Sequence, residues 1–215
     1  MEENRAVRVL VTGFEPFNGE KTNPSFDALK LVKEPENTKL HILELPVSFE
    51  KAPEILIRSI EKLNPDAVIC VGQAAGRSAI TPEKVGINWK QASIPDNDGK
   101  MPLGERIAEN SPDAYFSTLP IEEITKQIQK AKIPARISWS AGTYVCNTLM
   151  FSLLDFISKL PDDQKTAGGF IHVPYQTEQV LDKSGDVPSL TTEQIARALQ
   201  AAIETAAKHI QNQSV

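Results

Sequence analysis

The stretch RISWSAGTYVCNTLMFSLLDF (residues 136–156) contains a change of hydrophobic period that decides how this part of the chain folds. Its first residues alternate around Ile137 and Trp139, which predicts a β-strand, and residues 141–143 supply a turn. From Cys146 onward the apolar residues recur at helical spacing. Cys146 is therefore expected at the point where a strand gives way to a helix.

A cysteine at the start of a helix has unusual chemistry. The positive end of the helix dipole and the unpaired N–H groups of the first turn favour a thiolate, and they can also bind an oxyanion. Such a position suits a nucleophile. An inert, half-buried thiol explains the same stretch equally well, so both interpretations of Cys146 stay open at this point.

The rest of the chain alternates between strand and helix patterns. Apolar runs at Val7–Val11 and Ala67–Gly72 indicate strands buried in a mainly parallel sheet, and further strands are expected at residues 41–45 and 168–175. Amphipathic helices are predicted at residues 24–32, 49–63 and 120–131 and after Thr191, where Gln194 completes a capping box. This alternation predicts an α/β fold with a mostly parallel twisted sheet flanked by helices on both faces.

Composition limits the classes of protein to which the chain can belong. Its 215 residues, 40% of them hydrophobic, suit one domain over residues 1–215 whose core is large enough to be stable without disulfides or structural metals. The net charge of -5 and the pI near 5.3 give no attraction to nucleic acid or to anionic lipid, and no stretch is long enough to span a membrane. A small, roughly neutral ligand is expected.

The cysteine and histidine content indicates where the protein works and which cofactors it lacks. Cys70 and Cys146 are its two cysteines, and polar residues follow Met1 where a secretion signal would be apolar. These features predict a cytoplasmic protein with reduced thiols. No Cys, His and carboxylate cluster has metal-ligand spacing, so we expect no metal and no cofactor.

Four other residues are candidates for a site at the carboxyl edge of the sheet, where open α/β sheets bind ligands. His172 comes near the end of a strand, although such a histidine is more often structural. Glu83 stands beside Lys84, the usual pattern of a solvated surface pair. Phe14 and Phe17 lie in a loop rich in Gly and Pro, and they either pack in the core or line an apolar pocket. Cys70, in the middle of a buried strand, is expected to be inert.

A thiol and an imidazole that converge from two strand ends can perform acyl transfer. Histidine takes the thiol proton, the sulfur attacks a carbonyl, and histidine then protonates the leaving amine. A third group must orient the imidazole, and sequence spacing alone does not choose it. The residues by themselves therefore indicate a cysteine hydrolase with an unidentified third member.

Several motifs together resemble the pyroglutamyl-peptidase I, or pyrrolidone-carboxylate peptidase, family. They occur in the family's order across nearly the whole chain. The motifs are VTGFEPF (11–17), NPS (23–25), VGQ (71–73), ITPE (80–83), IPDN (94–97), AGTYVCN (141–147) and GFIHVPY (169–175).

This resemblance implies a cytosolic cysteine exopeptidase that removes an N-terminal pyroglutamyl residue from peptides through a thioester acyl-enzyme. It also implies a homotetramer and a fold similar to that of nucleoside phosphorylases. Cys146 would be the nucleophile, His172 the general base and then acid, and Glu83 the residue that holds the imidazole. The family's ring pocket maps onto Phe14, Phe17, Val47, Ile94, Tyr144 and Val145, with Gln73 as a polar contact.

Two positions depart from the family pattern. Ser93 stands where relatives commonly carry an arginine close to the thiol. The absence of that arginine weakens stabilisation of the thiolate or oxyanion unless Arg77, Lys84 or Lys90 takes its place. Tyr144 stands where many relatives have phenylalanine, and its hydroxyl requires a hydrogen-bond partner.

Two alternatives to an active pyroglutamyl peptidase therefore remain. The first is a weakly active or inactive binder of pyroglutamyl peptides, which the loss of the arginine at position 93 would explain. The second is a hydrolase of another small lactam or amide, because a fold does not dictate its substrate.

Overall fold

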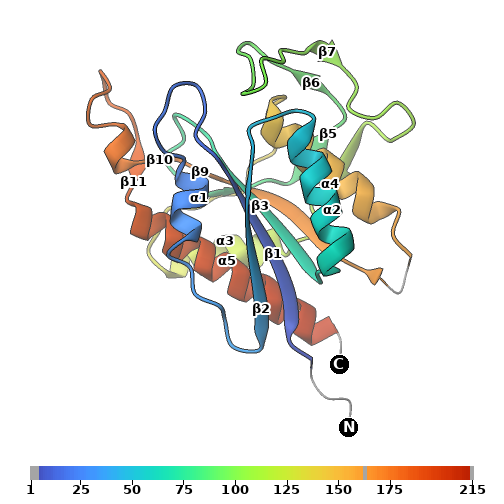
Figure 1. Ribbon diagram of the computed structural model, residues 1–215. Helices are drawn as coiled ribbons and strands as arrows, with labels where there is room; N and C mark the ends of the chain where they lie inside the picture. Colours follow the sequence, from blue (N-terminus) through green and yellow to red (C-terminus); the bar gives the residue numbers. More distant parts are fainter. Residues whose placement is uncertain (1–4, 162–163, 214–215) are drawn as a thin grey trace.

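The computed structural model describes residues 5–161 and 164–213, which form a five-stranded sheet between two layers of helices (Figure 1). The strand order is β2-β1-β3-β9-β4. All neighbours pair in parallel except β4, which runs antiparallel to β9 at the edge. The strands are β1 (Val7–Phe14), β2 (Thr38–Leu45), β3 (Ala67–Gln73), β4 (Thr81–Pro82) and β9 (Ala167–Val173).

The apolar runs of the sequence form the centre of this sheet. Every residue of β3 except Gln73 is buried, and in β1 only Arg8 is partly exposed. Strands that are covered on both faces need apolar side chains at successive positions, because no face is left for water. The predicted mostly parallel sheet is thereby confirmed.

Helices cover both faces of the sheet, as predicted. One face carries α1 (Pro24–Leu29), α3 (Ile121–Lys130) and α5 (Thr192–Gln213), and the other carries α2 (Lys51–Leu63) and α4 (Val145–Ser158) (Figure 1). Two helix caps are present, and the one at Thr191 was predicted. The Asn23 side chain accepts a hydrogen bond from the Ser25 N–H, and Thr191 and Gln194 form their reciprocal bonds. Helix α1 ends at Leu29, three residues before the predicted end.

The strand predicted ahead of Cys146 is absent from the sheet. Residues 136–139 run beside β4 with isolated bridges only, between Ile80 and Ala135 and between Glu83 and Ser138. Pro82 lacks an N–H donor, so the bond from position 82 to the Arg136 carbonyl is missing and the ladder that a regular strand would need is interrupted. The alternation that suggested a strand also fails to bury Trp139, whose surface is 69% exposed.

Two small antiparallel pairs extend the structure beyond the main sheet (Figure 1). The pairs are β5 (Val85–Ile87) with β8 (Ala114–Phe116), and β6 (Lys90–Gln91) with β7 (Leu103–Glu105). We call residues 88–113 the arm.

A short parallel pair and a 3₁₀ helix follow β9. They are β10 (Tyr175–Gln176), η2 (Thr177–Gln179) and β11 (Ser189–Leu190). Among the helices of the described residues, none is long and apolar enough to cross a membrane.

Candidate active site

Cys146 is the second residue of α4, as the sequence predicted. Tyr144 at the N-cap is extended, and its side chain makes no capping hydrogen bond, so no cap side chain competes for the N–H groups of the first turn. The thiol lies directly against β3. A Cβ atom added at Gly72 would stand 2.9 Å from Cys146 Sγ, which is closer than Cβ atoms approach other atoms in proteins. The thiol can therefore occupy this place only because residue 72 is a glycine.

His172 reaches the same point from the neighbouring strand. It is the register partner of Gly72 in the pairing of β3 with β9, so the thiol and the imidazole converge at one place on the sheet. Its Nδ1 lies 2.7 Å from Glu83 Oε1. A carboxylate accepts only, so Nδ1 carries the proton and Nε2 is left free to accept one. The Phe170 ring packs against the imidazole at a centroid distance of 4.7 Å.

Glu83 is fully buried, with an exposed fraction of 0%. The solvated pair with Lys84 that the residues alone suggested is wrong, because Lys84 Nζ binds Glu122 at 3.0 Å. Strand β4 runs antiparallel to β9, and the Glu83 N–H donates to the Phe170 carbonyl. This pairing turns the carboxylate towards His172, and a lone Glu-Lys pair in the sequence does not reveal it.

The ionisation of the three groups follows from their burial. Burial acts to raise the pKa of Glu83, but its bonds to His172 and Ser138 and the charge of Arg77 outweigh this effect and lower the pKa. Burial lowers the pKa of His172, against the opposing pull of Glu83. Burial and the Glu83 charge raise the pKa of Cys146 to about 12. At neutral pH the site therefore holds a thiol, a neutral imidazole and a carboxylate.

Arg77 is the one of the three candidate cations that reaches this constellation. Its guanidinium donates to Glu83 Oε1 at 2.5 Å and to the Ser140 carbonyl at 3.0 Å. Lys84 is paired with Glu122, and Lys90 is paired with Glu105 at 3.3 Å. Ser93 itself is exposed.

A small cavity of about 40 Å³ opens beside the thiol. At roughly 10–15 Å³ for each enclosed water, it suits a small ring better than a long side chain. Its lining residues are Phe14, Phe17, Asn23, Val47, Gln73, Tyr144, Val145 and Cys146. Of the pocket residues expected from the sequence, only Ile94 is missing from this lining, and it lies half-buried in the adjoining loop. Asn23 was not among the expected pocket residues, and it also caps α1.

Tyr144 finds the partner that its hydroxyl requires. The hydroxyl donates to the Pro95 carbonyl at 2.9 Å, and the ring meets Phe49 edge-on at 5.2 Å. Burial raises the pKa of Tyr144 to about 12. The extra oxygen thus ties the pocket wall to the loop that follows Ser93.

Asn147 is a site-supporting residue that the sequence did not single out. It is fully buried. Its amide accepts from the Ile87 N–H and donates to the carbonyls of Ile87 and Trp89, each at 2.9 Å. A polar residue next to Cys146, within an apolar helix, was the only signal available.

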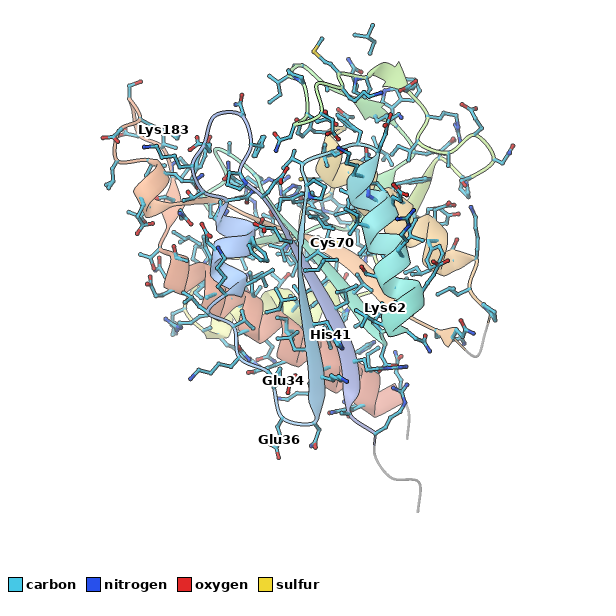
Figure 2. All side chains as sticks on the ribbon, in the orientation of Figure 1. Glu34, Glu36, His41, Lys62, Cys70 and Lys183 are labelled. Carbon is cyan, nitrogen blue, oxygen red and sulfur yellow. The ribbon has the colours of Figure 1, made fainter. Side chains whose placement is uncertain are left out.

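Cys70 lies within the central sheet (Figure 2). Burial raises the pKa of its thiol to about 12. It is free, like Cys146, and its surroundings agree with the expected inert role.

A thiol at a helix N-terminus, an adjacent imidazole and a buried carboxylate on that imidazole together define an α/β hydrolase of the cysteine type. The chain belongs to the pyroglutamyl peptidase family, whose model matches residues 7–209.

Individual relatives agree over almost their full lengths. A pyrrolidone-carboxylate peptidase of Bacillus amyloliquefaciens is 47% identical over 94% of this chain and 93% of its own. One from Thermosipho melanesiensis is 50% identical over 92% and 97% of the two chains.

Solved structures confirm the fold class. The crystal structure of pyroglutamyl peptidase I from Bacillus amyloliquefaciens superposes with a TM-score of 0.89 at 46% identity, covering 95% of this chain and 96% of that one. Pyrrolidone carboxyl peptidase from Pyrococcus furiosus gives 0.90 at 42% identity, with 95% and 100% covered.

Proposed function

We propose that this chain is a cysteine exopeptidase that hydrolyses the bond after an N-terminal pyroglutamyl residue. Cys146 is the nucleophile, His172 the base and then the acid, and Glu83 the residue that orients the imidazole. The observation that carries the proposal is the position of Gly72, which touches the thiol on one side and pairs with His172 on the next strand. The names of the relatives support the choice of substrate.

The reaction begins with a neutral thiol at Cys146 and a neutral imidazole at His172. His172 Nε2 accepts the Cys146 proton as sulfur bonds to the pyroglutamyl carbonyl carbon, and Glu83 Oε1 stabilises the imidazolium through Nδ1–H. The carbonyl oxygen takes the negative charge, which the first-turn N–H groups of α4 stabilise. When the intermediate collapses, the C–N bond breaks and Nε2 protonates the leaving amine. Water, deprotonated by His172, then cleaves the thioester and restores the thiol.

The cavity supports a blocked and uncharged ring as the bound group. Its wall contains aromatic and aliphatic side chains with the amides of Gln73 and Asn23, and no carboxylate is among its lining residues. A free N-terminus would bring an ammonium group that no lining side chain can pair. We therefore propose peptides with N-terminal pyroglutamate as the substrates.

The test is release of aminomethylcoumarin from pyroglutamyl-aminomethylcoumarin by three proteins: wild type, Cys146→Ala and the matched control Cys70→Ala. We expect turnover by wild type and by Cys70→Ala, and its loss in Cys146→Ala. Full activity in Cys146→Ala would refute the mechanism. A folded wild type that binds 2-pyrrolidone but does not release aminomethylcoumarin would instead favour the inactive peptide binder that Ser93 suggests. A wild type that fails to bind 2-pyrrolidone would favour a hydrolase of another lactam or amide.

The assembly and location are further parts of this proposal. The arm exposes apolar side chains, with Leu103 85% and Met101 47% accessible, and burying them between copies supports a homotetramer. Two unpaired cysteines support a cytoplasmic location. The family match across residues 7–209 supports a single catalytic domain.

A further inference from the structure

Arg77 has an unusual position for a side chain outside the reacting groups. It follows β3 in the loop at the carboxyl edge of the sheet, and its side chain is 23% exposed. Besides Glu83 and the Ser140 carbonyl, its guanidinium donates to the Thr81 hydroxyl. One side chain therefore links the loop after β3, strand β4 and the segment that leads to Cys146.

The contact with Glu83 is the critical one. Arg77 Nη1 and His172 Nδ1 both bind the same oxygen, Oε1, at 2.5 and 2.7 Å. The other oxygen, Oε2, is buried and has no well-formed hydrogen bond from any described residue. Two donors, the Arg77 guanidinium and the His172 imidazole, therefore hold the carboxylate at one atom, Oε1.

The contact with Ser140 connects this carboxylate to the nucleophile. The segment of residues 138–144 has little regular structure, with one isolated bridge at Ser138. Ser140 Oγ accepts from the Gly142 N–H, and the Thr143 and Tyr144 side chains bind the loop at residues 91–95. A planar guanidinium can hold a carboxylate and a carbonyl at fixed separation, which an ammonium group cannot do.

We infer that Arg77 is a positioning residue of the reaction: it sets the orientation of Glu83 and, through Ser140, the approach of Cys146 to His172. The inference rests on the proposed hydrolase function. Arg77 is absent from the lining of the ring cavity, so it acts on the reacting groups and leaves substrate affinity unchanged. It also offsets the Glu83 charge, so that His172 stays neutral and able to accept the thiol proton.

The expected signs follow from this charge balance. Arg77→Gln removes a cation near His172 and leaves Glu83 paired with the imidazole alone, which raises the pKa of His172. The acid limb of the kcat/KM profile then moves to higher pH. We expect kcat to fall by about tenfold to a hundredfold, the size that misplaced reacting groups produce, while KM stays within about twofold. Arg77→Lys should keep the acid limb at its wild-type pH but should not keep the full kcat, because lysine supplies the positive charge without the planar set of N–H donors of a guanidinium.

The experiment compares wild type, Arg77→Gln, Arg77→Lys and Arg106→Gln in pH profiles of kcat and KM. Arg106 is a matched control, since it also binds a carboxylate, Asp113, and a carbonyl, Ser111, but lies in the arm. An Arg77→Gln profile and kcat equal to those of wild type would overturn the inference. If Arg77→Gln fails to fold, Arg77→Lys decides: a reduced kcat with an unshifted acid limb supports the inference, and a wild-type kcat overturns it.

A second measurement separates this inference from the proposed function. The chain has three histidines, so the pKa of His172 can be followed by NMR without turnover, with His172→Gln to assign its signal. A wild type that fails to release aminomethylcoumarin refutes the function. A His172 pKa that stays unchanged in Arg77→Gln refutes the charge balance, whether or not the enzyme turns over.

Discussion

At position 72 the missing side chain is what allows the thiol to lie beside the imidazole. A Cβ in Gly72→Ala would meet Phe170 at 2.7 Å and Cys146 Sγ at 2.9 Å, so both must move. We expect kcat to fall by about a hundredfold, since a displacement of about 1 Å can cost that much. The measurement is kcat per folded molecule.

Gly169→Ala is a matched control for this prediction. A Cβ there would clash with Ser117 Oγ and meet Leu119 at 2.8 Å, so the position is at least as crowded but lies away from the thiol. It should lower the melting temperature without changing kcat per folded molecule. Equal losses of kcat in the two variants would show that crowding alone, and not the position of the thiol, matters.

The pH dependence of the reaction is also set by single residues. In the proposed mechanism His172 must be neutral to accept the thiol proton, so we expect kcat/KM to fall as the pH drops through the pKa of His172. Burial lowers this pKa from the ordinary 6.5. We therefore expect the acid limb of kcat/KM for wild type below pH 6.5. A limb above that value would show that the Glu83 charge outweighs burial.

Helix α4 depends on its anchoring by Asn147. The three hydrogen bonds of this amide join the first turn of α4 to β5 and to Trp89, the residue before β6. Asn147→Ala leaves half-buried backbone groups at Ile87 and Trp89 without this partner, at a cost of up to about 1–3 kcal/mol each. We expect lower stability in urea unfolding together with a lower kcat, because the helix that carries the thiol loses its attachment.

Asn88 provides the comparison for this element. Its amide binds backbone groups at Ile107, Ala108, Ser111 and Pro112 within the arm. Asn88→Ala should therefore lower stability while kcat per folded molecule stays unchanged. Unchanged kcat in Asn147→Ala would remove the proposed link between helix anchoring and catalysis.

The elements that sequence predicted best are those whose period is set by burial on the sheet. Strands β1 and β3 and helix α4, which begins one residue before Cys146, follow directly from apolar spacing. The contact of Glu83 with His172 does not, because it depends on an antiparallel edge strand of two residues, too short to show a period. Resemblance to the family singled out Glu83 where periodicity could not. The bonds of Arg77 and Asn147 are tertiary, and no local pattern encodes them.

For the whole molecule, the arm is the feature that a single copy does not explain. Leu103→Lys would place a charge in the proposed contact between copies and should shift the protein towards smaller species in light scattering after size exclusion. Leu181→Lys is the control, since Leu181 is 73% exposed on the segment after η2. A wild type that is already monomeric would refute the assembly.

The protonated state of Cys146 has a consequence for how this protein survives between reactions. Hydrogen peroxide attacks thiolates and largely spares thiols. Because burial and the Glu83 charge keep the Cys146 proton in place, sulfenic acid should form slowly on the idle protein. In the proposed mechanism the anion forms only as sulfur bonds to the substrate carbonyl carbon. We therefore expect protection from oxidative damage to follow from the same burial that, in the proposed mechanism, makes Cys146 depend on His172.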